Sequence, residues 1–210
     1  MVKNVIFDFG NVLVHFDPAQ ITRQYAADSC SDSDRALLTR VCFDRKYWDR
    51  MDEGVLDESD VVPLACAQLP ERLHPSVRNI FANWYRDLPE WTGMADLLSE
   101  LKMRGYRLYL LSNISRTFAA HSGELSILQP FDGKLMSATV HLVKPSAAIF
   151  HRLLTQFDLL ADECIFIDDA PRNIAGAQAA GIAAIPFTGN VPALRAELLH
   201  RLSETETPRP

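Results

Sequence analysis

The sequence has few cysteines, and they show none of the patterns by which cysteine binds metal. Cys30, Cys42, Cys66 and Cys164 lie far apart, without a Cys-x-x-Cys pair and without histidines at zinc-site spacing. Isolated cysteines of this kind are typical of small buried side chains in a reducing compartment. We therefore expect a cytoplasmic protein that has neither disulfides nor a cysteine-bound metal.

Basic runs and long apolar runs are also missing. No stretch approaches the ~20 apolar residues that cross a bilayer, and a charged turn follows the first apolar run too soon for a signal peptide. The net charge is −6 over 210 residues, which makes nucleic acid and anionic membranes poor partners. We expect neither of them as a partner, and the oligomeric state stays open.

Apolar residues make up 48% of the chain, enough to bury a core as one domain or as one domain with an insertion. The first apolar run, Val5-Ile6-Phe7, predicts a strand buried on both faces, which ends at Asp8 because Gly10-Asn11 breaks it. Ligands of open α/β sheets lie beyond the carboxyl ends of the strands. We therefore expect Asp8 to face a ligand crevice, where a carboxylate can attack phosphorus or carbon, bind a metal or cap a turn.

The next part of the chain carries helical patterns and no convincing strand. Asp17-Pro18 and Asp57 are typical of helix starts, and Pro75 opens a further helix. Five short helices are expected before Pro89. They predict a compact helical unit that follows the first strand.

Strands and helices then alternate, with one helix opened by Pro145 and strands expected at 106–111, 135–138, 164–167 and 182–187. This pattern predicts an α/β fold, a Rossmann-like parallel sheet with helices on both faces. Because the helical unit interrupts the sheet, it is an inserted small α-helical cap. We expect a core domain of residues 1–15 and 90–203, a cap of residues 16–89 and a disordered tail at 204–210.

Polar side chains stand where several of the predicted strands end, or just before a helix. They are Asp8, Ser112, Asn113, Lys144, Asp168 and Asp169. In a parallel sheet these positions meet at one edge, so we expect the side chains to lie together. The aspartates are hard oxygen ligands suited to Mg²⁺, and the hydroxyl and amine suit phosphate oxygens.

A formal charge count shows that phosphate binding beside the aspartates would require Lys144 and Mg²⁺. The three aspartates contribute −3, and a phosphomonoester brings about −2 at neutral pH. The aspartates alone would repel this phosphate, whereas Lys144 and Mg²⁺ add +3 and offset most of the negative charge. The sequence therefore predicts Mg²⁺-dependent binding of a small phosphorylated molecule.

With these residues in this order, the chain resembles the haloacid dehalogenase-like hydrolase superfamily, in particular its phosphatases with an inserted helical cap. The matching motifs are Phe7-Asp8-Phe9-Gly10-Asn11-Val12-Leu13, Leu111-Ser112-Asn113, Lys144-Pro145, and Ile167-Asp168-Asp169 with Asn173 beyond. The resemblance covers nearly the whole chain. The Asp-Phe-Gly-Asn form is similar to a bacterial branch that includes alpha-D-glucose-1-phosphate phosphatase.

The resemblance implies a role for each residue of the site. Asp8 would be the nucleophile that forms an aspartyl-phosphate, while Ser112, Asn113 and Lys144 would hold the transferring phosphoryl group. The implied ligands of Mg²⁺ are Asp8, the Gly10 carbonyl, Asp168 and, directly or through water, Asp169.

Gly10 is a departure from the superfamily pattern. Most of its phosphatases carry a second Asp two residues after the nucleophile, which protonates the leaving alkoxide and then activates water. A general acid contributes roughly 10²–10⁴ in rate. Our hypothesis is that the enzyme favours leaving groups that need little help, such as those of anomeric sugar, aryl or acyl phosphates. His15 or Asp17 could take over the role, although a flap residue and a helix cap are the simpler interpretations.

The sequence thus predicts a Mg²⁺-dependent phosphomonoester hydrolase acting on a small phosphorylated metabolite, with a sugar phosphate expected. A 2-haloacid dehalogenase, which needs no metal, is one alternative, although it would gain nothing from Asp168-Asp169. A phosphomutase would need the acid that Gly10 replaces. A non-catalytic regulator that binds a phosphorylated ligand or a protein is favoured by Gly10 and disfavoured by the intact Asp8 and Lys144.

The cap is expected to decide the substrate. Cap residues expected to face the active site are Tyr47, Trp48, Asp49, Arg50 and Asp52-Glu53-Gly54. Trp48 could stack on a sugar ring, although packing in the core is the simpler role. We expect the cap to close over small molecules by hinging near Phe16-Asp17 and Pro89.

Overall fold

A five-stranded parallel sheet forms the centre of the computed structural model, which describes residues 1–204. The strands are β1 (Asn4–Phe7), β2 (Arg107–Ser112), β3 (Gly133–Met136), β4 (Cys164–Asp168) and β5 (Ala183–Pro186). Their order is β3-β2-β1-β4-β5, and every neighbouring pair is parallel. The chain therefore leaves β1 towards one edge of the sheet and later returns to its other side. This confirms the predicted Rossmann-like sheet and makes β1 its central strand.

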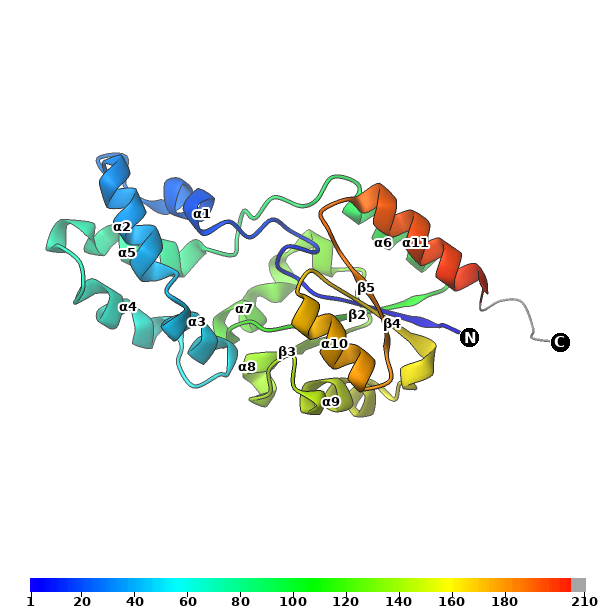
Figure 1. Cartoon of the computed structure of the whole chain (residues 1–210). Helices are drawn as coiled ribbons and strands as arrows, with labels where there is room; N and C mark the ends of the chain where they lie inside the picture. The colour runs from blue at the N-terminus through cyan, green and yellow to red at the C-terminus, as the bar shows by residue number, and fades with distance from the viewer. Residues whose placement is uncertain (205–210) are drawn as a thin grey trace.

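Helices cover both faces of the sheet, and the strand sequences show why. In β1, Val5 and Phe7 pack with α6 (Met94–Met103) and α11 (Val191–Glu204), whereas Ile6 packs on the other face with α9 (Ala147–Phe157) and α10 (Pro171–Ala179). Figure 1 shows these helix pairs on opposite sides of the sheet. Since successive side chains of a strand alternate between the faces, a strand buried on both faces must be apolar throughout.

Five helices precede α6 and pack around an apolar cluster of their own. They are α1 (Pro18–Tyr25), α2 (Asp32–Cys42), α3 (Arg45–Asp52), α4 (Glu58–Cys66) and α5 (His74–Asn83). The carboxylate of Asp17 accepts hydrogen bonds from two backbone N–H groups of α1, and Asp57 caps α4, as the sequence predicts. In Figure 1 this helical unit lies to the left of the sheet.

Two extended segments that run side by side join the helical unit to the sheet (Figure 1). Val14 and Glu90 form an antiparallel bridge, and the N–H of His15 donates to the carbonyl oxygen of Pro89 at 2.7 Å. The division into a core of residues 1–15 and 90–203 and a cap of residues 16–89 stays a prediction. We call these parts the sheet domain and the cap.

Two predicted elements differ from the structure by two residues, and the predicted ends of the other strands differ by at most one. The predicted strand at 135–138 is β3, which ends at Met136 because its partner β2 ends opposite at Ser112, and the chain turns into α8 (Ser137–Val140). The helix expected to open at Pro145 begins at Ala147, since the Ser146 hydroxyl accepts from the N–H of Ala148.

The remaining elements are short. They are α7 (Arg116–His121), which Ser115 caps, and the 3₁₀ turns η1 (Glu71–Leu73), η2 (Ser122–Glu124), η3 (Ser126–Leu128) and η4 (Ala161–Glu163). All four cysteines are buried and free, as expected from their spacing. Within residues 1–204, no helix has both the length and the apolar character needed to cross a membrane. Of the predicted tail, Glu204 ends α11 and the rest lies outside the described residues.

Candidate active site

The ends of three neighbouring strands bring the predicted site residues together. Asp8 follows β1 directly, and Ser112 and Asp168 are the last residues of β2 and β4. The backbone N–H of Asp8 donates to the carbonyl oxygen of Ile167 in β4 at 2.9 Å, which fixes Asp8 beside β4. Strands β2 and β3 lie on one side of β1, and β4 and β5 lie on the other. The sheet therefore has a topological switch point beside β1, and these residues line the crevice there.

Lys144 lies between two of the carboxylates. Its Nζ is 2.8 Å from Oδ1 of Asp8 and 2.7 Å from Oδ2 of Asp168, and the residue is only 3% exposed. Burial alone would lower the pKa of this amine, but Asp8 and Asp168 outweigh it, so the pKa lies above its usual value. Lys144 is therefore a fixed positive charge at the floor of the site.

Asn113 holds the loop that carries Lys144. Its side-chain Nδ2 donates to the carbonyl oxygen of Lys144 at 3.0 Å, and its Oδ1 accepts from the N–H of Lys144 at 2.8 Å. The structure therefore shows this side chain positioning Lys144. Its predicted contact with a phosphoryl group is not visible in this geometry.

Three acidic residues meet beside Lys144. Carboxylate oxygens of Asp8, Asp168 and Asp169 all lie within 4.8 Å of one another. Burial raises the pKa of Asp8 to about 6, with Lys144 opposing and Asp168 adding to the shift. Burial and the nearby Asp168 also raise the pKa of Asp169. Crowded carboxylates with raised pKa values are typical of a site that binds a cation.

Asn173 supplies a direct test of whether these residues fit a hydrated metal ion. Its Nδ2 donates to both carboxylate oxygens of Asp168, at 3.0 and 3.1 Å. Its Oδ1 is buried and has no hydrogen-bond partner among the described residues. A buried amide oxygen needs a donor, and Mg²⁺ in proteins usually keeps several waters. The oxygen donors and this unpaired acceptor together fit a Mg²⁺ ion with bound water.

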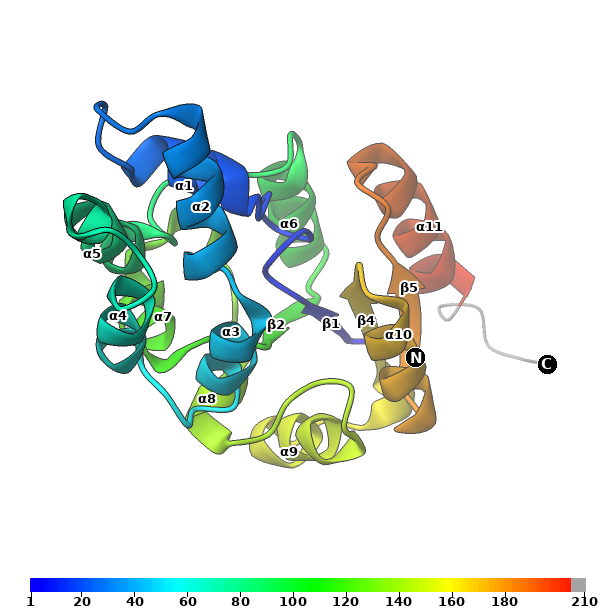
Figure 2. The same cartoon turned by 60° about the vertical axis from the view of Figure 1, so that its left-hand side comes forward.

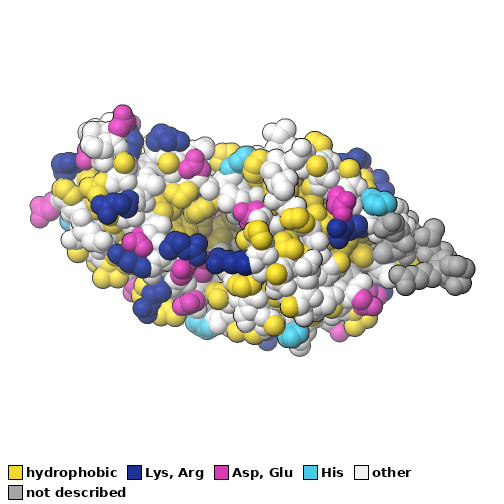
Figure 3. All heavy atoms as spheres, viewed as in Figure 1, with side chains coloured by type: hydrophobic (Ala, Val, Ile, Leu, Met, Phe, Trp, Pro, Cys, Tyr) yellow, Lys and Arg dark blue, Asp and Glu magenta, His cyan; other side chains and the backbone are white. Residues whose placement is uncertain are grey.

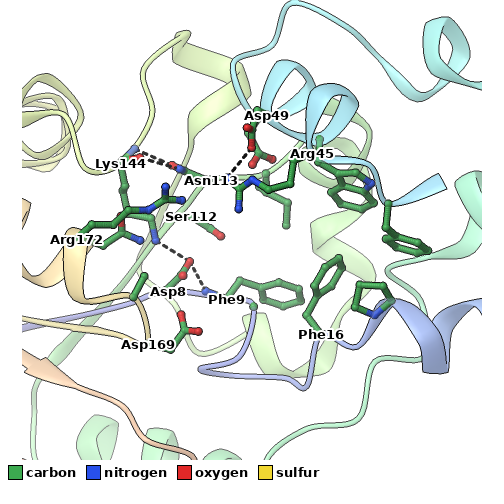
Figure 4. Close-up of a pocket in the computed structure, with 18 of the residues that line it drawn as sticks. Asp8, Phe9, Phe16, Arg45, Asp49, Ser112, Asn113, Lys144, Asp169 and Arg172 are labelled. Carbon is green, nitrogen blue, oxygen red and sulfur yellow. Dashed lines mark hydrogen bonds and ion pairs between the residues drawn. The ribbon is translucent and has the colours of Figure 1, made fainter. Parts of the chain in front are cut away.

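A cavity of about 360 Å³ opens above these residues, between the sheet domain and the cap. Figure 3 shows it as a hollow lined mainly by apolar side chains, with Lys and Arg side chains along one side. In Figure 4, Asp8, Ser112 and Asp169 lie at one side of the cavity, Arg45 and Asp49 approach from α3, and Phe16 lies across from Asp169. Its volume suits a small molecule.

Aromatic residues form one side of this cavity. We call Phe16, Phe43, Trp48 and Trp84 the aromatic wall. Trp48 stacks on Phe43 at 5.3 Å between ring centroids and meets Trp84 edge-on at 4.9 Å. The indole N–H of Trp48 donates to the carbonyl oxygen of Cys42, and that of Trp84 donates to Glu58. The wall therefore offers ring carbons to a ligand and no free hydrogen-bond donor.

Only some of the cap residues that were expected to face the site line the cavity. Trp48, Asp49 and Asp52 line the cavity, whereas Tyr47 and Arg50 do not. Tyr47 is buried within the cap cluster, because its ring lies on the opposite side of the short α3 helix. Glu53 and Gly54 contact the sheet domain instead, as described below.

Neither proposed substitute for the missing acid reaches the site. The ring of His15 packs on Trp91, with centroids 3.6 Å apart, and the carboxylate of Asp17 caps α1. Neither residue lines the cavity that contains Asp8. The hypothesis that one of them donates a proton is therefore wrong, because local packing and capping hold both side chains elsewhere.

Sequence reasoning missed several residues of the cavity, among them Phe43, Arg45, Trp84 and Arg172. Arg45 and Phe43 carry no motif, and only the folding of the cap turns them towards the sheet. Arg172 lies at the start of α10 and lines the cavity beside Asn173. Its position three residues after Asp169 was the one available signal, since the start of a helix at this edge points towards the crevice.

The sequence model of the haloacid dehalogenase-like hydrolase family matches residues 2–181, so the chain belongs to this family. Two similar curated proteins are phosphatases. A sesquiterpene phosphatase of Aspergillus oryzae is 28% identical over 193 residues, which cover 90% of this chain and 91% of that protein. A D-ribitol-5-phosphate phosphatase of Bacteroides thetaiotaomicron is 24% identical over 189 residues, covering 83% and 86%. The family expected from the motifs is confirmed.

Solved structures of this family share the fold. One is a haloacid dehalogenase family enzyme of Bacteroides thetaiotaomicron in complex with magnesium and inorganic phosphate. It matches with a TM-score of 0.69 and 18% identity over 92% of this chain and 99% of that chain. At this identity the likeness establishes the fold, and the chemistry has to be argued from the residues themselves.

Proposed function

We propose that the protein is a Mg²⁺-dependent phosphomonoester hydrolase that acts on a small phosphorylated metabolite through an aspartyl-phosphate at Asp8. The observation that carries this proposal is the Asp8–Lys144–Asp168 arrangement, in which one buried amine contacts both carboxylates. A nucleophilic carboxylate, a fixed cation and a second acidic ligand are the groups that phosphoryl transfer needs in one place.

Each residue has a task in this reaction. Asp8 attacks phosphorus through the carboxylate oxygen that faces the cavity, and the bond between phosphorus and the leaving oxygen breaks. Ser112 and Lys144 hold the equatorial phosphoryl oxygens, with the amine balancing their charge. Water then releases phosphate from Asp8. Because Asn113 fixes the loop of Lys144 through two hydrogen bonds, the amine needs little reorganisation during the reaction.

The metal-binding residues in this proposal are Asp8, the Gly10 carbonyl, Asp168 and Asp169. Bound there, Mg²⁺ would neutralise the acidic residues and polarise the phosphoryl group. The unpaired Oδ1 of Asn173 would accept a hydrogen bond from a metal-bound water. Arg172 adds a further positive charge at the rim of the cavity.

The substrate is a small phosphate ester that fits about 360 Å³. A sugar phosphate stays our candidate, since a sugar can lay its C–H face on the aromatic wall and reach Asp49 or Arg45 with its hydroxyls. The wall equally favours an apolar ester, because its indole N–H groups are already bonded within the cap. Similarity to a sesquiterpene phosphatase supports this second substrate class.

Hydrolysis of p-nitrophenyl phosphate by the purified chain, with Mg²⁺ and with a chelator, tests the activity. We expect turnover that requires Mg²⁺ and that Asp8→Asn abolishes, since loss of a covalent nucleophile costs on the order of 10⁶ in kcat. A screen of sugar phosphates and isoprenoid phosphates then decides the substrate class. Far-ultraviolet circular dichroism and thermal unfolding confirm that the variant is folded.

The same variant separates the alternatives. A regulator would show no turnover and would keep its ligand binding in Asp8→Asn. A 2-haloacid dehalogenase would release halide from a 2-haloacid without Mg²⁺. Either result, in the absence of phosphate release, would refute the proposed activity.

A further inference from the structure

The position that lacks an acid has room for a Cβ atom. Gly10 lines the cavity, and a Cβ atom built there would meet its nearest neighbour, the Cβ of Phe16, at 3.8 Å. This is an ordinary van der Waals distance, so sterics do not explain the glycine. A proton donor for the leaving oxygen has to come from another part of the cavity.

Attack geometry shows which part that is. In phosphoryl transfer the attacking and leaving oxygens lie roughly in line on opposite sides of phosphorus. Asp8 attacks from the edge of the sheet, so the leaving oxygen points away from the sheet and towards the cap. Two acidic residues of the cap, Asp49 and Asp52, line the cavity there, and both belong to α3.

These two carboxylates differ in their partners. Asp49 forms an ion pair with Arg45 at 2.8 Å, as Figure 4 shows. The carboxylate of Asp52 makes no hydrogen bond or ion pair with any described residue. Of the two cap carboxylates that line this cavity, that of Asp52 is therefore the one free to meet a ligand.

Asp52 is also held firmly in place, by backbone contacts across the cavity edge. The hydroxyl of Ser137 in α8 donates to the carbonyl oxygen of Asp52 at 2.6 Å. One residue on, Nδ1 of His141 is 3.0 Å from the carbonyl oxygen of Glu53. Figure 2 shows the resulting closeness of α3 and α8. The end of α3 is thereby docked onto the sheet domain, while the side chain of Asp52 stays unbound.

The electrostatic surroundings favour a protonated carboxyl group. Burial raises the pKa of Asp52 to about 7, with Asp49 and Asp8 adding to the shift and Lys144 and Arg45 opposing it. Further charged groups around it line the adjoining pocket, and these are Glu53 and Arg172. A group with a pKa near neutrality can both give and take a proton.

We infer that Asp52 is the general acid of the proposed phosphatase reaction, delivering a proton from the cap to the oxygen that leaves phosphorus. This inference rests on the proposed function. It replaces the hypothesis that the enzyme manages without an acid.

The proton balance of the two steps is complete. As Asp8 bonds to phosphorus, the P–O bond to the organic group breaks, and the leaving oxygen takes that electron pair and the proton of Asp52 to form an alcohol. The Asp52 carboxylate then takes a proton from water, whose oxygen bonds to phosphorus. The bond between phosphorus and Asp8 breaks, its electron pair returns to Asp8, and phosphate leaves while Asp52 is again protonated.

Two esters of similar size test this role. Benzyl phosphate releases a strongly basic alkoxide, whereas p-nitrophenyl phosphate releases a stabilised phenolate that needs no proton. In Asp52→Asn we expect kcat/KM for benzyl phosphate to fall by roughly 10²–10⁴, with less than a tenfold change for p-nitrophenyl phosphate. The second substrate also shows that the variant is folded and keeps its nucleophile.

Two further variants serve as controls. Asp49→Asn removes the same charge from the same helix but keeps the acid, so it should move the decline of benzyl phosphate hydrolysis to lower pH without abolishing that hydrolysis. Asp52→Glu keeps a carboxyl group and should recover part of the benzyl phosphate activity. The wild-type kcat/KM for benzyl phosphate should fall as the pH rises through the pKa of Asp52, and this decline should be missing in Asp52→Asn.

Equal losses on both esters in Asp52→Asn, or no loss on either, would overturn the inference. With p-nitrophenyl phosphate still hydrolysed in an Asp8-dependent manner, that result would leave the proposed function intact. If the wild-type protein hydrolysed neither ester, the proposed function itself would fail, and the inference with it.

Discussion

At the scale of single residues, the site depends on a buried amine that forms ion pairs with two carboxylates. Lys144 contacts Asp8 and Asp168 at hydrogen-bond distance with almost no exposure to water. Buried ions of this kind are stable only when they are paired. The same pairing holds Asp8 beside a fixed positive charge, which would also attract the oxygens of a phosphoryl group.

Gly10 leads to a prediction at this scale. In the Asp52→Asn background, Gly10→Asp should restore benzyl phosphate hydrolysis, because it places a carboxyl group beside the nucleophile at a cavity-lining position where a Cβ atom meets no close neighbour. We expect recovery of at least ~10-fold out of the 10²–10⁴ that a general acid contributes. The measurement is kcat/KM for both esters. Gly10→Ala in the same background adds only a methyl group and is the matched control. Equal rates for the Asp and Ala variants would mean that a missing proton donor does not limit Asp52→Asn.

At the scale of elements, the cap is positioned by the turn after α3. Gly54 has φ +69°, and a Cβ atom there would lie 2.3 Å from the carbonyl oxygen of Ala138. Only glycine therefore allows this turn to approach α8 so closely. The close approach fixes the end of α3, where Asp52 lines the cavity.

Gly54→Ala should separate the cap from α8 and lower kcat/KM for benzyl phosphate by about tenfold or more, since small misplacements of a catalytic group are costly. Gly105→Ala is the matched control, because Gly105 also has a positive φ of +88° but no atom within 4 Å of a built Cβ. Gly105→Ala should lose roughly 1–2 kcal/mol of stability through backbone strain, and Gly54→Ala should lose more, because its Cβ atom also clashes with the carbonyl oxygen of Ala138. Thermal unfolding and steady-state kinetics measure the two effects. Equal activity in both variants would show that docking at Gly54 does not position the acid.

At the scale of the whole molecule, the acidic site makes stability depend on pH. The pKa of Asp8 rises to about 6 and that of Asp52 to about 7, both from 3.8. The folded state therefore holds these protons more tightly than the unfolded chain does. This contribution to stability is fully present below pH 3.8 and is lost as the pH rises through about 6 and about 7.

Mg²⁺ should offset this loss. At 100 times its dissociation constant, a ligand that binds only the folded state stabilises it by about 2.7 kcal/mol, which corresponds to roughly 5–10 °C in Tm for a chain of this size. We expect a larger Tm shift at pH 8 than at pH 5, because protonated carboxyl groups do not bind the cation. Asp168→Asn should abolish the shift. An equal shift in that variant, measured by calorimetry, would place the metal elsewhere.

Local chemistry is enough to predict much of this molecule. Continuous apolar residues around Ile6 and Ile165 specify strands buried on both faces, and Asp17 and Asp57 specify where cap helices begin. The carboxyl ends of parallel strands must meet at one edge, so the sequence also predicts that Asp8 and Asp168 lie close together. Such features depend on neighbours in the chain or on a rule of sheet topology.

Only the tertiary structure decides what stands opposite that edge. Local spacing gives Asp49 an ion-pair partner in Arg45, four residues earlier on the same helix, but no local pattern shows that Asp52 reaches the cavity. Docking of the turn at Gly54 onto α8 separates them, together with the ion pair that engages Asp49. The aromatic wall arises in the same way, from residues between 16 and 84 that the cap folds together. Contacts between distant segments depend on packing of the whole chain, which no local pattern encodes.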